Sequence, residues 1–579
     1  MKLKKSIQTG IVALCATIAG VSCTDTWDEH YSVNSSSVAG ISLWELIEND
    51  ESLKNFKRVL DSCEFKRVLA SSQVFSVWAP EIDEATAQHW IDVYKAEKAR
   101  GVREDDNSAL NQFVKNHIAL YNHQVSSVSG KDTIVMMNGK RMTLSADMLN
   151  NDASIEGTPG NAGNGVLYKV NKTLSFNPNI WERIQADSVG DNALDSVYKF
   201  FATWNEVVLN EEASVQGGIK DGKVWYLDSV MTFNNTYLYS YGQIYNEDSM
   251  YWYSAPTNKV WNEKLPEFRK FFQFHKDRGA LVADSLQNHY AKLLLTYPTF
   301  FNVRDQYKDF NIEQPDSIFN TSYSSYNYKF NVFEKPFEAN GVLAGLTSEE
   351  CSNGRLYKMN EWNVPLLKTT FLRQLDIEAE FNDNYSSVPL NAPDRTDSIA
   401  IIVSTVDQGV DTCRVSRGRF IRVSDNRTSA RKNQPEISFM INNTLSNVPY
   451  DIAVVFATPL ARDTTEASKA EAQLKRQVTA KIRFYPKYDS NEMHEPKNAV
   501  TIGSKIDVDA TKMDTVIINT ASAYKNGVTF PVCNYGEPEA RVIVTLQSLK
   551  GNDGLLKKGY AQELYIDEII MIPRIEENK

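Results

Sequence analysis

The feature that most constrains the fold is a segment that occurs twice. Asn164–Asn171 reads NGVLYKVN and Asn353–Asn360 reads NGRLYKMN, so six of the eight positions are identical. Upstream of each copy lies a second matched pair, Val74–Pro80 (VFSVWAP) and Met250–Asn258 (MYWYSAPTN). Two motifs that recur in the same order indicate an internal repeat, so we expect two units of one fold.

Each motif indicates a particular local structure. The upstream motif is a short apolar and aromatic run that ends at a proline, which is typical of a buried strand leading into a turn. The downstream motif begins with Asn-Gly, where glycine supplies the positive φ that the turn needs. Ahead of the first copy, Leu43 to Leu60 is apolar at helical spacing, and Ser42 with Glu45 can form a capping box. Phe113–Ile118 is predicted to be a helix entering a strand, so each unit should mix α and β structure.

This order resembles the fasciclin-like domain: a helical opening, a strand of the form F-x-x-F-A-P-T-N, a helix ending near Asn-His, and a closing strand that begins Asn-Gly. The segments of this sequence that match the family pattern best are Tyr253–Asn258, Asn116–Ile118 and the two Asn-Gly segments. The resemblance implies fasciclin-like domains at residues 38–185 and 190–373. The second copy departs from the pattern, because Asn-His is missing and Thr232–Phe333 is long and rich in tyrosine and asparagine. That copy is therefore degenerate or carries insertions.

The last part of the chain has a different pattern of apolar residues. Short apolar or alternating runs separated by turn residues predict an antiparallel β-sandwich over residues 374–579, and its closing strand resembles the end of jelly-roll domains. The segment 463–477 is either a short helix or an exposed loop. The expected fold class is α+β with several domains: two tandem fasciclin-like domains followed by an antiparallel, jelly-roll-like β-sandwich. The predicted strands are Ser398–Val403, Asp451–Phe456, Val478–Phe484, Thr515–Ile518, Ala540–Leu546 and Leu564–Pro573.

Residues 1–22 have the pattern of a secretory signal peptide. A basic start, MKLKK, precedes an apolar run that is too short to span a bilayer, and small residues lead up to Cys23. The pattern predicts cleavage before Cys23 and lipid attachment to it, with residues 23–37 as the anchored linker; an incidental thiol after an ordinary signal peptide is the alternative. The acidic stretch Thr24–Glu29 resembles the lipoprotein export signal of Bacteroidota. That resemblance implies a lipid-anchored location on the outer face of the outer membrane.

Charge and cysteine spacing argue against several classes of partner and cofactor. A net charge of −11, with no run of Lys or Arg, makes nucleic acid an unexpected partner. Beyond Cys15 and Cys23 the cysteines occur singly, so neither a zinc motif nor a redox motif is visible. Cys413 and Cys533 share the C-terminal segment, where they either form a disulfide or pack as separate buried thiols.

No catalytic motif is recognisable, whether a nucleophile elbow, H-E-x-x-H, a phosphate-binding loop or a dinucleotide fingerprint. His117 and His123 form the closest histidine pair, but no carboxylate cluster accompanies them, so a structural role is expected. In fasciclin-like domains the histidine at the place of His117 is structural, as the resemblance implies. We therefore expect a protein that is not an enzyme and that binds no metal and no cofactor.

The second unit is rich in tyrosine interleaved with asparagine and serine. Such rings suit stacking on sugars or packing against another protein, whereas alternating tyrosine is also what half-buried strands use. The candidate contact residues are Tyr237, Tyr239, Tyr241, Tyr323, Tyr326 and Tyr328.

The whole pattern resembles the fasciclin-domain surface lipoproteins of Bacteroidota that accompany SusC/SusD-type uptake systems. That resemblance implies an accessory binding subunit beside a TonB-dependent transporter and a SusD-like lipoprotein, with an oligosaccharide or peptide as ligand. The alternative is an adhesin that binds host or neighbouring-cell proteins through its fasciclin-like domains. A third interpretation is a hydrolase in the second repeat, which would require a site with two paired carboxylates.

Overall fold

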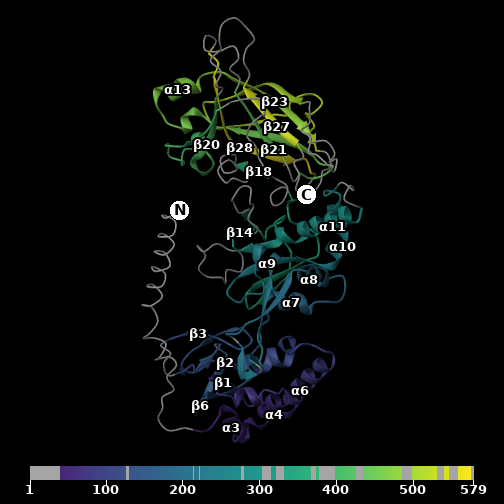
Figure 1. The fold of residues 1–579 in the computed structure, drawn as a ribbon, viewed down its shortest axis with the longest axis vertical. Coiled ribbons are helices and arrows are strands. Elements are labelled where there is room, and N and C mark those ends of the chain that lie inside the picture. Colours follow the sequence, from purple (N-terminus) through teal and green to yellow (C-terminus); the bar gives the residue numbers. More distant parts are fainter. Residues whose placement is uncertain are drawn as a thin grey trace.

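A computed structural model gives the structure of most of the chain. It describes residues 40–125, 130–150, 152–212, 214–220, 222–274, 280–302, 315–320, 332–366, 373–376, 398–424, 435–441, 444–484, 499–530, 540–546 and 559–575. Three groups of elements follow one another along the longest axis in chain order (Figure 1). We refer to them as the first unit, the second unit and the C-terminal unit.

The first unit packs helices on one face of a curved sheet. The strands run in the order β2-β1-β7-β6-β5-β4-β3, and a bridge between Ala119 and Met136 brings the two ends of this sheet together. Ser42 and Glu45 form the predicted capping box, but the helical stretch is broken, because Asp50 caps a separate turn before α4 begins. The helical elements are α3 (Leu43–Glu48), η1 (Glu51–Leu53), α4 (Lys54–Ser62), α5 (Lys66–Leu69), α6 (Glu84–Ala99), η2 (Glu104–Asp106), η3 (Leu110–Val114) and η4 (Lys115–His117). The strands are β1 (Phe75–Pro80), β2 (Ile118–Leu120), β3 (Asp132–Val135), β4 (Arg141–Leu144), β5 (Met148–Leu149), β6 (Ala153–Ala162) and β7 (Gly165–Val170).

The second unit repeats the centre of this sheet. Its strands run in the order β15-β14-β13-β12-β17-β16, with helices packed against them. Helix α7 begins at a second capping box, formed by Asn179 and Glu182, and it packs in the core of this unit. The helical elements are α7 (Ile180–Ala186), α8 (Asp195–Ala202), α9 (Thr236–Tyr241), α10 (Asn258–Arg269), α11 (Ala280–Thr296) and η7 (Tyr297–Thr299). The strands are β8 (Asn205–Leu209), β9 (Val215–Lys220), β10 (Lys223–Asp228), β11 (Met231–Asn235), β12 (Tyr251–Pro256), β13 (Phe300–Asn302), β14 (Ser317–Asn320), β15 (Val332–Glu334), β16 (Ser348–Cys351) and β17 (Gly354–Met359).

The predicted repeat is confirmed by strand register. Strands β1 and β7 pair in parallel with Phe75 opposite Gly165, and β12 and β17 pair in parallel with Tyr251 opposite Gly354. Each pairing continues for the same length and ends at the proline, Pro80 in one unit and Pro256 in the other. The two sequence motifs of each repeat are therefore the two neighbouring central strands of one sheet.

The Asn-Gly turn has the same role in both units. Asn164 accepts a hydrogen bond from Leu43 N at the start of α3 and donates to Leu69 O and Ser71 O. Asn353 does the same for α7, accepting from Ile180 N and donating to Ile244 O and Asn246 O. Both asparagines are buried. One side chain thus joins the first helix of each unit to the loop before the central strand.

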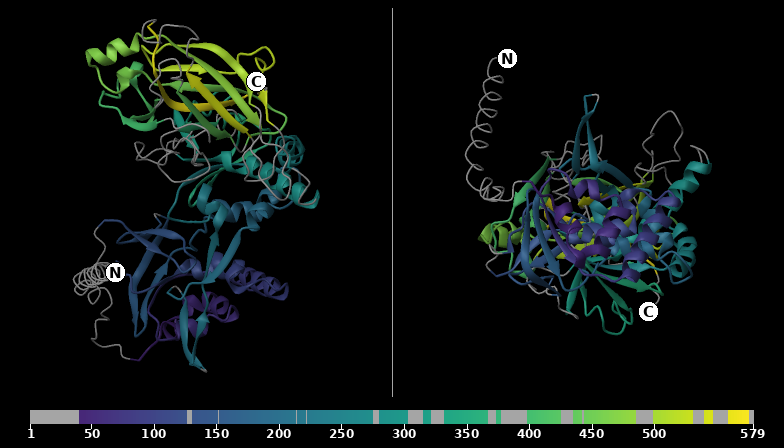
Figure 2. Two further views of the ribbon diagram at one scale, coloured as in Figure 1. Left: turned by 45° about the horizontal axis from the view of Figure 1, so that its top comes forward. Right: turned by 90° about the horizontal axis from the view of Figure 1, so that it is seen from below.

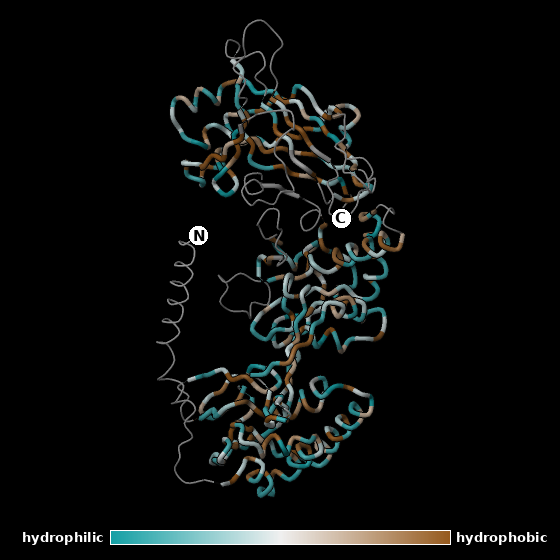
Figure 3. Tube along the Cα trace, in the orientation of Figure 1, coloured by the Kyte–Doolittle hydropathy of each residue, from teal (hydrophilic) through white to brown (hydrophobic). Residues whose placement is uncertain are grey.

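The C-terminal unit consists of two antiparallel sheets. Strands β19, β20, β28, β22 and β25, with β18 and β26, form one sheet, and β21-β27-β23-β24 form the other. Their inward side chains share one core, which appears as the brown strands in the upper part of Figure 3. The strands are β18 (Arg373–Asp376), β19 (Ser398–Val403), β20 (Arg419–Ser424), β21 (Glu436–Ile441), β22 (Pro449–Phe456), β23 (Arg476–Phe484), β24 (Val500–Val508), β25 (Asp514–Ile517), β26 (Val528–Thr529), β27 (Ala540–Leu546) and β28 (Glu563–Pro573).

Each of the six predicted C-terminal strands is present, and the sequence analysis missed β20, β21 and β24 among others. The segment 463–477 contains the short helix α13 (Glu466–Ala472), which contacts the turn η11 (Pro459–Ala461). Two further turns, η9 (Asp411–Cys413) and η10 (Ser416–Gly418), lie between β19 and β20 in the chain. Among the described residues, the helices are too short or too polar to cross a bilayer.

Candidate functional site

The second unit contains a long hairpin that has no counterpart among the described residues of the first unit. Strand β8 pairs with β11, and β9 pairs with β10, so residues 205–235 form one antiparallel arm. At its middle, Ser214 Oγ accepts from Val230 N and donates to Asn210 O, which joins the two halves across a kink. In the first unit only Cys63 to Phe65 connect α4 to α5, the helices that match α8 and α9. The tyrosine- and asparagine-rich composition of the second repeat predicts an insertion at residues 232–333, whereas the arm begins upstream of that range, at Asn205.

The arm contacts the first unit through buried groups. Val215 lies in the hydrophobic core of the first unit and the partly buried Leu227 packs against that core, although both belong to the second repeat. Beside them Lys115 Nζ lies 3.0 Å from Asp228 Oδ1, and both side chains are more than nine-tenths buried. A buried ion pair whose partners come from two units is sensitive to loss of either charge. The arm therefore completes the core of the first unit.

A second buried cation lies at the same junction. Lys140, in the turn before β4, donates to Glu182 Oε2 and Glu247 Oε1, each at 2.6 Å. Asn179, which caps α7, donates to the same Glu247 oxygen at 2.9 Å. Arg141 and Asp248 add an exposed ion pair beside it. These contacts and the arm hold the first two units in one relative orientation.

The far half of the arm is exposed. Among its side chains Ile219, Val224 and Trp225 are large, apolar and exposed to solvent. Figure 2 shows the arm running from the second unit beside the first, with its end projecting from the body. The sequence analysis missed this element. An available signal was the turn pair Asp221-Gly222 between Ile219 and Val224, which is a strong hairpin pattern.

The tyrosine prediction is corrected in part. Tyr237 lies in the core with its Oη 2.5 Å from Thr296 Oγ1, and burial raises its pKa well above the usual value, so a ligand cannot contact it. Tyr241 is half-buried against Tyr237, with ring centroids 4.7 Å apart. Tyr239, at 72% exposure, is the most accessible of the three described. Tyr323, Tyr326 and Tyr328 lie outside the described residues, so their role stays a prediction.

His117 has the structural role that was predicted for it. Its Nδ1 donates to Phe113 O at 2.7 Å, and its Nε2 accepts from Leu174 N at 3.0 Å, so both ring nitrogens are bonded to the backbone. Burial lowers the pKa of His117 to about 4, which keeps the ring neutral. His123 lies 3.0 Å from Leu120 O through Nε2. Among the described residues no cluster of His, Cys, Asp and Glu has the geometry of a metal site.

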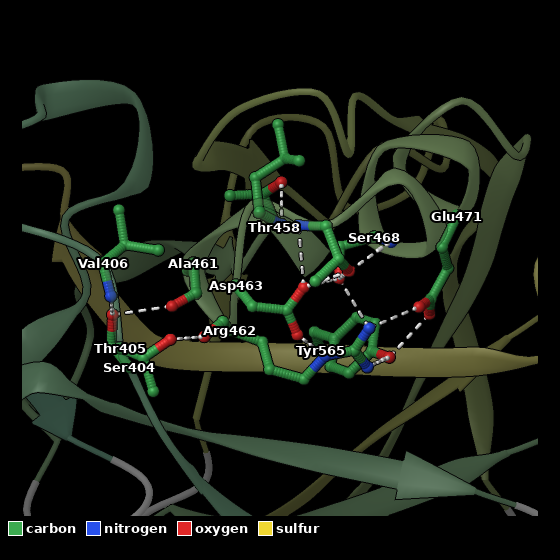
Figure 4. Close-up of polar contacts among 12 residues, drawn as sticks. Ser404, Thr405, Val406, Thr458, Ala461, Arg462, Asp463, Ser468, Glu471 and Tyr565 are labelled. Carbon is green, nitrogen blue, oxygen red and sulfur yellow. Dashed lines mark hydrogen bonds and ion pairs between the residues drawn. The ribbon is translucent and has the colours of Figure 1, made fainter.

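The C-terminal unit contains a dense polar cluster beside α13 (Figure 4). The Tyr565 hydroxyl lies 2.6 Å from both Glu471 Oε1 and Glu563 Oε2, and burial together with these carboxylates raises its pKa. Arg462 donates to Tyr565 Oη, Ser468 Oγ and Glu471 Oε2. Because Glu471 belongs to α13 and Tyr565 to β28, these hydrogen bonds fasten the helix to the strand.

The cysteine predictions stay largely open. Cys23 and Cys533 lie outside the described residues, so lipid attachment and the disulfide remain predictions. Cys413 is buried near η9 and makes no disulfide with a described cysteine. Cys63 and Cys351 are free and buried, and burial raises the pKa of each thiol to about 12. These two thiols are structural, because a buried protonated thiol is a poor nucleophile.

Comparison with known proteins identifies part of the first unit. Residues 51–176, from η1 to just beyond β7, match the Fasciclin domain family. No curated protein matches the chain. One matching solved structure is entitled "Novel Fold Revealed by the Structure of a FAS1 Domain Pair from the Insect Cell Adhesion Molecule Fasciclin I". It is 10% identical, covers 56% of this chain and 100% of its own, and has a TM-score of 0.17, too low to support an argument about arrangement. The first unit therefore contains a fasciclin domain at residues 51–176.

Proposed function

We propose that this protein is a non-catalytic, lipid-anchored surface protein that binds another macromolecule as an accessory subunit of a SusC/SusD-type uptake complex. The observation that supports it best is the rigid pair formed by the fasciclin domain and the second unit. Buried ion pairs at Lys115 and Lys140 fix this pair, and the arm extends from it. A preorganised surface loses little conformational entropy on binding, which favours a scaffold role.

The shared register supports the proposed domain arrangement, in which the second unit is a divergent fasciclin-like domain whose β12 and β17 pair as β1 and β7 do. The proposed domains span residues 38–185 and 190–373, and α7, near the end of the first range, packs with the second unit. The C-terminal unit would be a jelly-roll-like β-sandwich within residues 374–579. Residues 1–22 would be the signal peptide and 23–37 the linker.

The proposed location depends on Cys23. A lipid on Cys23 would tether the domains to the outer membrane and keep them at high effective concentration beside other membrane components. The proposed partners are a TonB-dependent transporter and a SusD-like lipoprotein, with an oligosaccharide or peptide as the ligand that the complex takes up.

The test is a pull-down of the full-length protein, tagged at its C-terminus, from native outer membranes in mild detergent, with mass spectrometry of what co-purifies. Cys23→Ser is the matched control, because it removes the lipid and changes nothing in the described units. Stoichiometric recovery of a transporter and its lid lipoprotein supports the proposal. Recovery of the tagged protein alone contradicts it, and selective binding of the purified protein to host or neighbouring-cell proteins would instead favour adhesion.

A further inference from the structure

The distal arm, defined as residues 215–220 and 222–228, carries a group of exposed apolar side chains. Three of the seventeen large apolar side chains that are exposed in the described structure lie in it, and two more, Val207 and Val208, lie nearer the base of the hairpin. In the distal arm Ile219 is 77% exposed, Val224 44% and Trp225 42%. Single exposed apolar residues are normal, but several close together on a protruding element mark an interaction site.

These side chains occupy both faces of a two-stranded ribbon. Ile219 lies opposite Val224, and Gly218 lies opposite Trp225. Because residues alternate between faces along a strand, the two aliphatic side chains share one face and the indole lies on the other. Among the described strands β9 and β10 pair only with each other. A ribbon that is apolar on both faces fits a groove better than a flat surface.

The indole lies against glycine. A Cβ at Gly217 would stand 2.5 Å from the Trp225 ring, and one at Gly218 would stand 3.3 Å from Trp225 Nε1. The two glycines thus let the ring lie close against the neighbouring strand while its outer part stays exposed. A tryptophan held in this way can bind a partner at a low cost in side-chain entropy.

The face that carries Trp225 is also basic. Lys220 and Lys223 lie opposite one another, two residues beyond the Gly218–Trp225 pair, and therefore on the same face. The chain as a whole has a net charge of −11, so a local pair of lysines distinguishes this face from the average surface. Carboxylates on a partner would complement it.

We propose that the distal arm is a docking surface that inserts into a groove of a protein partner. One wall of this groove presents carboxylates to the face that carries Trp225 and the two lysines. The other wall presents apolar side chains to Ile219 and Val224. The base of the arm is anchored at Val215 and Asp228, so the surface is continuous with an interface that already orders it. Insertion into a lipid membrane is disfavoured, because Lys220 and Lys223, the last pair of the ribbon, would enter first with their charges. The proposal deepens the proposed function by naming the surface that the partner contacts.

The first experiment is site-specific photo-crosslinking of the full-length protein in intact native cells. A benzophenone amino acid is placed at position 219, at position 225, or at the control position 189, where Val189 is nearly fully exposed in the same unit. We expect positions 219 and 225 to crosslink to the same protein and position 189 not to do so. Crosslinking only to lipid, glycan or a second copy of this chain overturns the proposal, as does the absence of any crosslink.

The second experiment measures binding of the purified crosslinked partner to the full-length protein and its variants. Ile219→Ser and Lys220→Glu/Lys223→Glu should each weaken binding by about tenfold or more, as is typical of central interface residues. Val189→Ser is the matched control and should bind as the unaltered protein does. All of these side chains are exposed, so the melting temperature should not change. Binding that is unaffected by the arm substitutions overturns the proposal.

The two proposals fail in different ways. If a transporter complex co-purifies but neither arm variant weakens its recovery, the proposed function stands and the docking surface is wrong. If the arm binds a protein that belongs to no transporter complex, the docking surface stands and the proposed function is wrong.

Discussion

The first and second units share the backbone of their centre and differ in what surrounds it. In both, two parallel strands pair in one register, an asparagine side chain joins the first helix to the sheet, and a glycine of positive φ follows it. Among the described residues of these two units, the arm belongs to the second. The two units therefore share the strand pairing and the Asn-Gly turn that the centre of the sheet requires. A loop that connects two helices is under no such constraint, so it can lengthen and become an interface.

The helix-to-strand junction shows a second difference. Val77 pairs with Ile118 in the first unit, and Tyr253 pairs with Phe300 in the second, so Thr299 stands at the place of His117. His117 bonds the backbone through both nitrogens, whereas Thr299 Oγ1 donates to Thr296 O. Tyr253 instead stacks on Phe300 with centroids 4.4 Å apart. The second unit thus uses aromatic packing at the position where the first uses a buried histidine.

The largest effect should come from the two glycines that the units share. A Cβ at Gly165 would stand 1.9 Å from Phe75 O, and one at Gly354 would stand 1.8 Å from Tyr251 O. Gly165→Ala and Gly354→Ala should each lower the free energy of unfolding by more than about 4 kcal/mol, measured by soluble yield and urea unfolding. Gly101→Ala is the control, because its Cβ meets nothing within 4 Å and costs only the strain of a positive φ, about 1–2 kcal/mol. Tolerance of alanine at one site alone would break the equivalence of the two turns.

The arm should be the next most sensitive feature. Asp228→Asn removes the charge that faces Lys115 without changing the shape of the side chain, and we expect a loss of about 3–4 kcal/mol. Hydrogen exchange should speed up in both the arm and the first unit. The matched control is Asp248→Asn at the exposed pair with Arg141, which should cost less than about 1 kcal/mol. If Asp228→Asn affected only the arm, the first unit would not depend on it.

The sequence could predict those features of the structure that residues close together in the chain determine. The repeated motifs, the capping box at Ser42 and the C-terminal strands could be predicted, because neighbouring residues determine a cap, a turn or an alternating strand. The buried lysines could not, because Lys115 and Lys140 find their carboxylates in the other unit.

The tyrosine series shows the same limit at a smaller scale. Tyr237, Tyr239 and Tyr241 alternate as they would along a strand, but Asn235 caps a helix here. In a helix, residues four apart share a face, so Tyr237 and Tyr241 pack together and Tyr239 points to solvent. Composition alone therefore could not separate the buried Tyr237 from the exposed Tyr239, and Tyr237 fits the alternative interpretation of core packing.

The buried histidine should make the first unit more sensitive to acid. Its pKa of about 4 in the folded protein lies below the ordinary 6.5, so its contribution to stability is complete above pH 6.5 and is lost as the pH falls towards 4. The loss should reach about 3 kcal/mol near pH 4. His289, half-buried on α11 of the second unit, has a pKa lowered by burial and adds a smaller dependence of the same sign.

Hydrogen exchange measures this difference between the units. Peptides that contain Ile118–Leu120 and Gly165–Val170 should lose protection between pH 6.5 and 4.5, and those that contain β13 and β17 should lose less. His117→Gln is the matched variant, because its amide can hydrogen-bond but does not titrate in this range. An unchanged pH profile in this variant would mean that another group of the first unit is responsible.

The helix caps should give the smallest effect and the finest comparison. Ser42 and Asn179 cap α3 and α7 in the same way, each accepting from the backbone N–H three residues on. Ser42→Ala should cost about 1 kcal/mol, the usual value of a cap. Asn179→Ala should cost about 2 kcal/mol, because Asn179 also donates to Glu247, which holds Lys140 at the junction. Urea unfolding of both variants, with Asn179→Ser as the control that restores only the cap, separates the two roles. Equal costs for the two alanine variants would mean that the bond to Glu247 adds nothing, and that the junction is held by Lys140 and the arm alone.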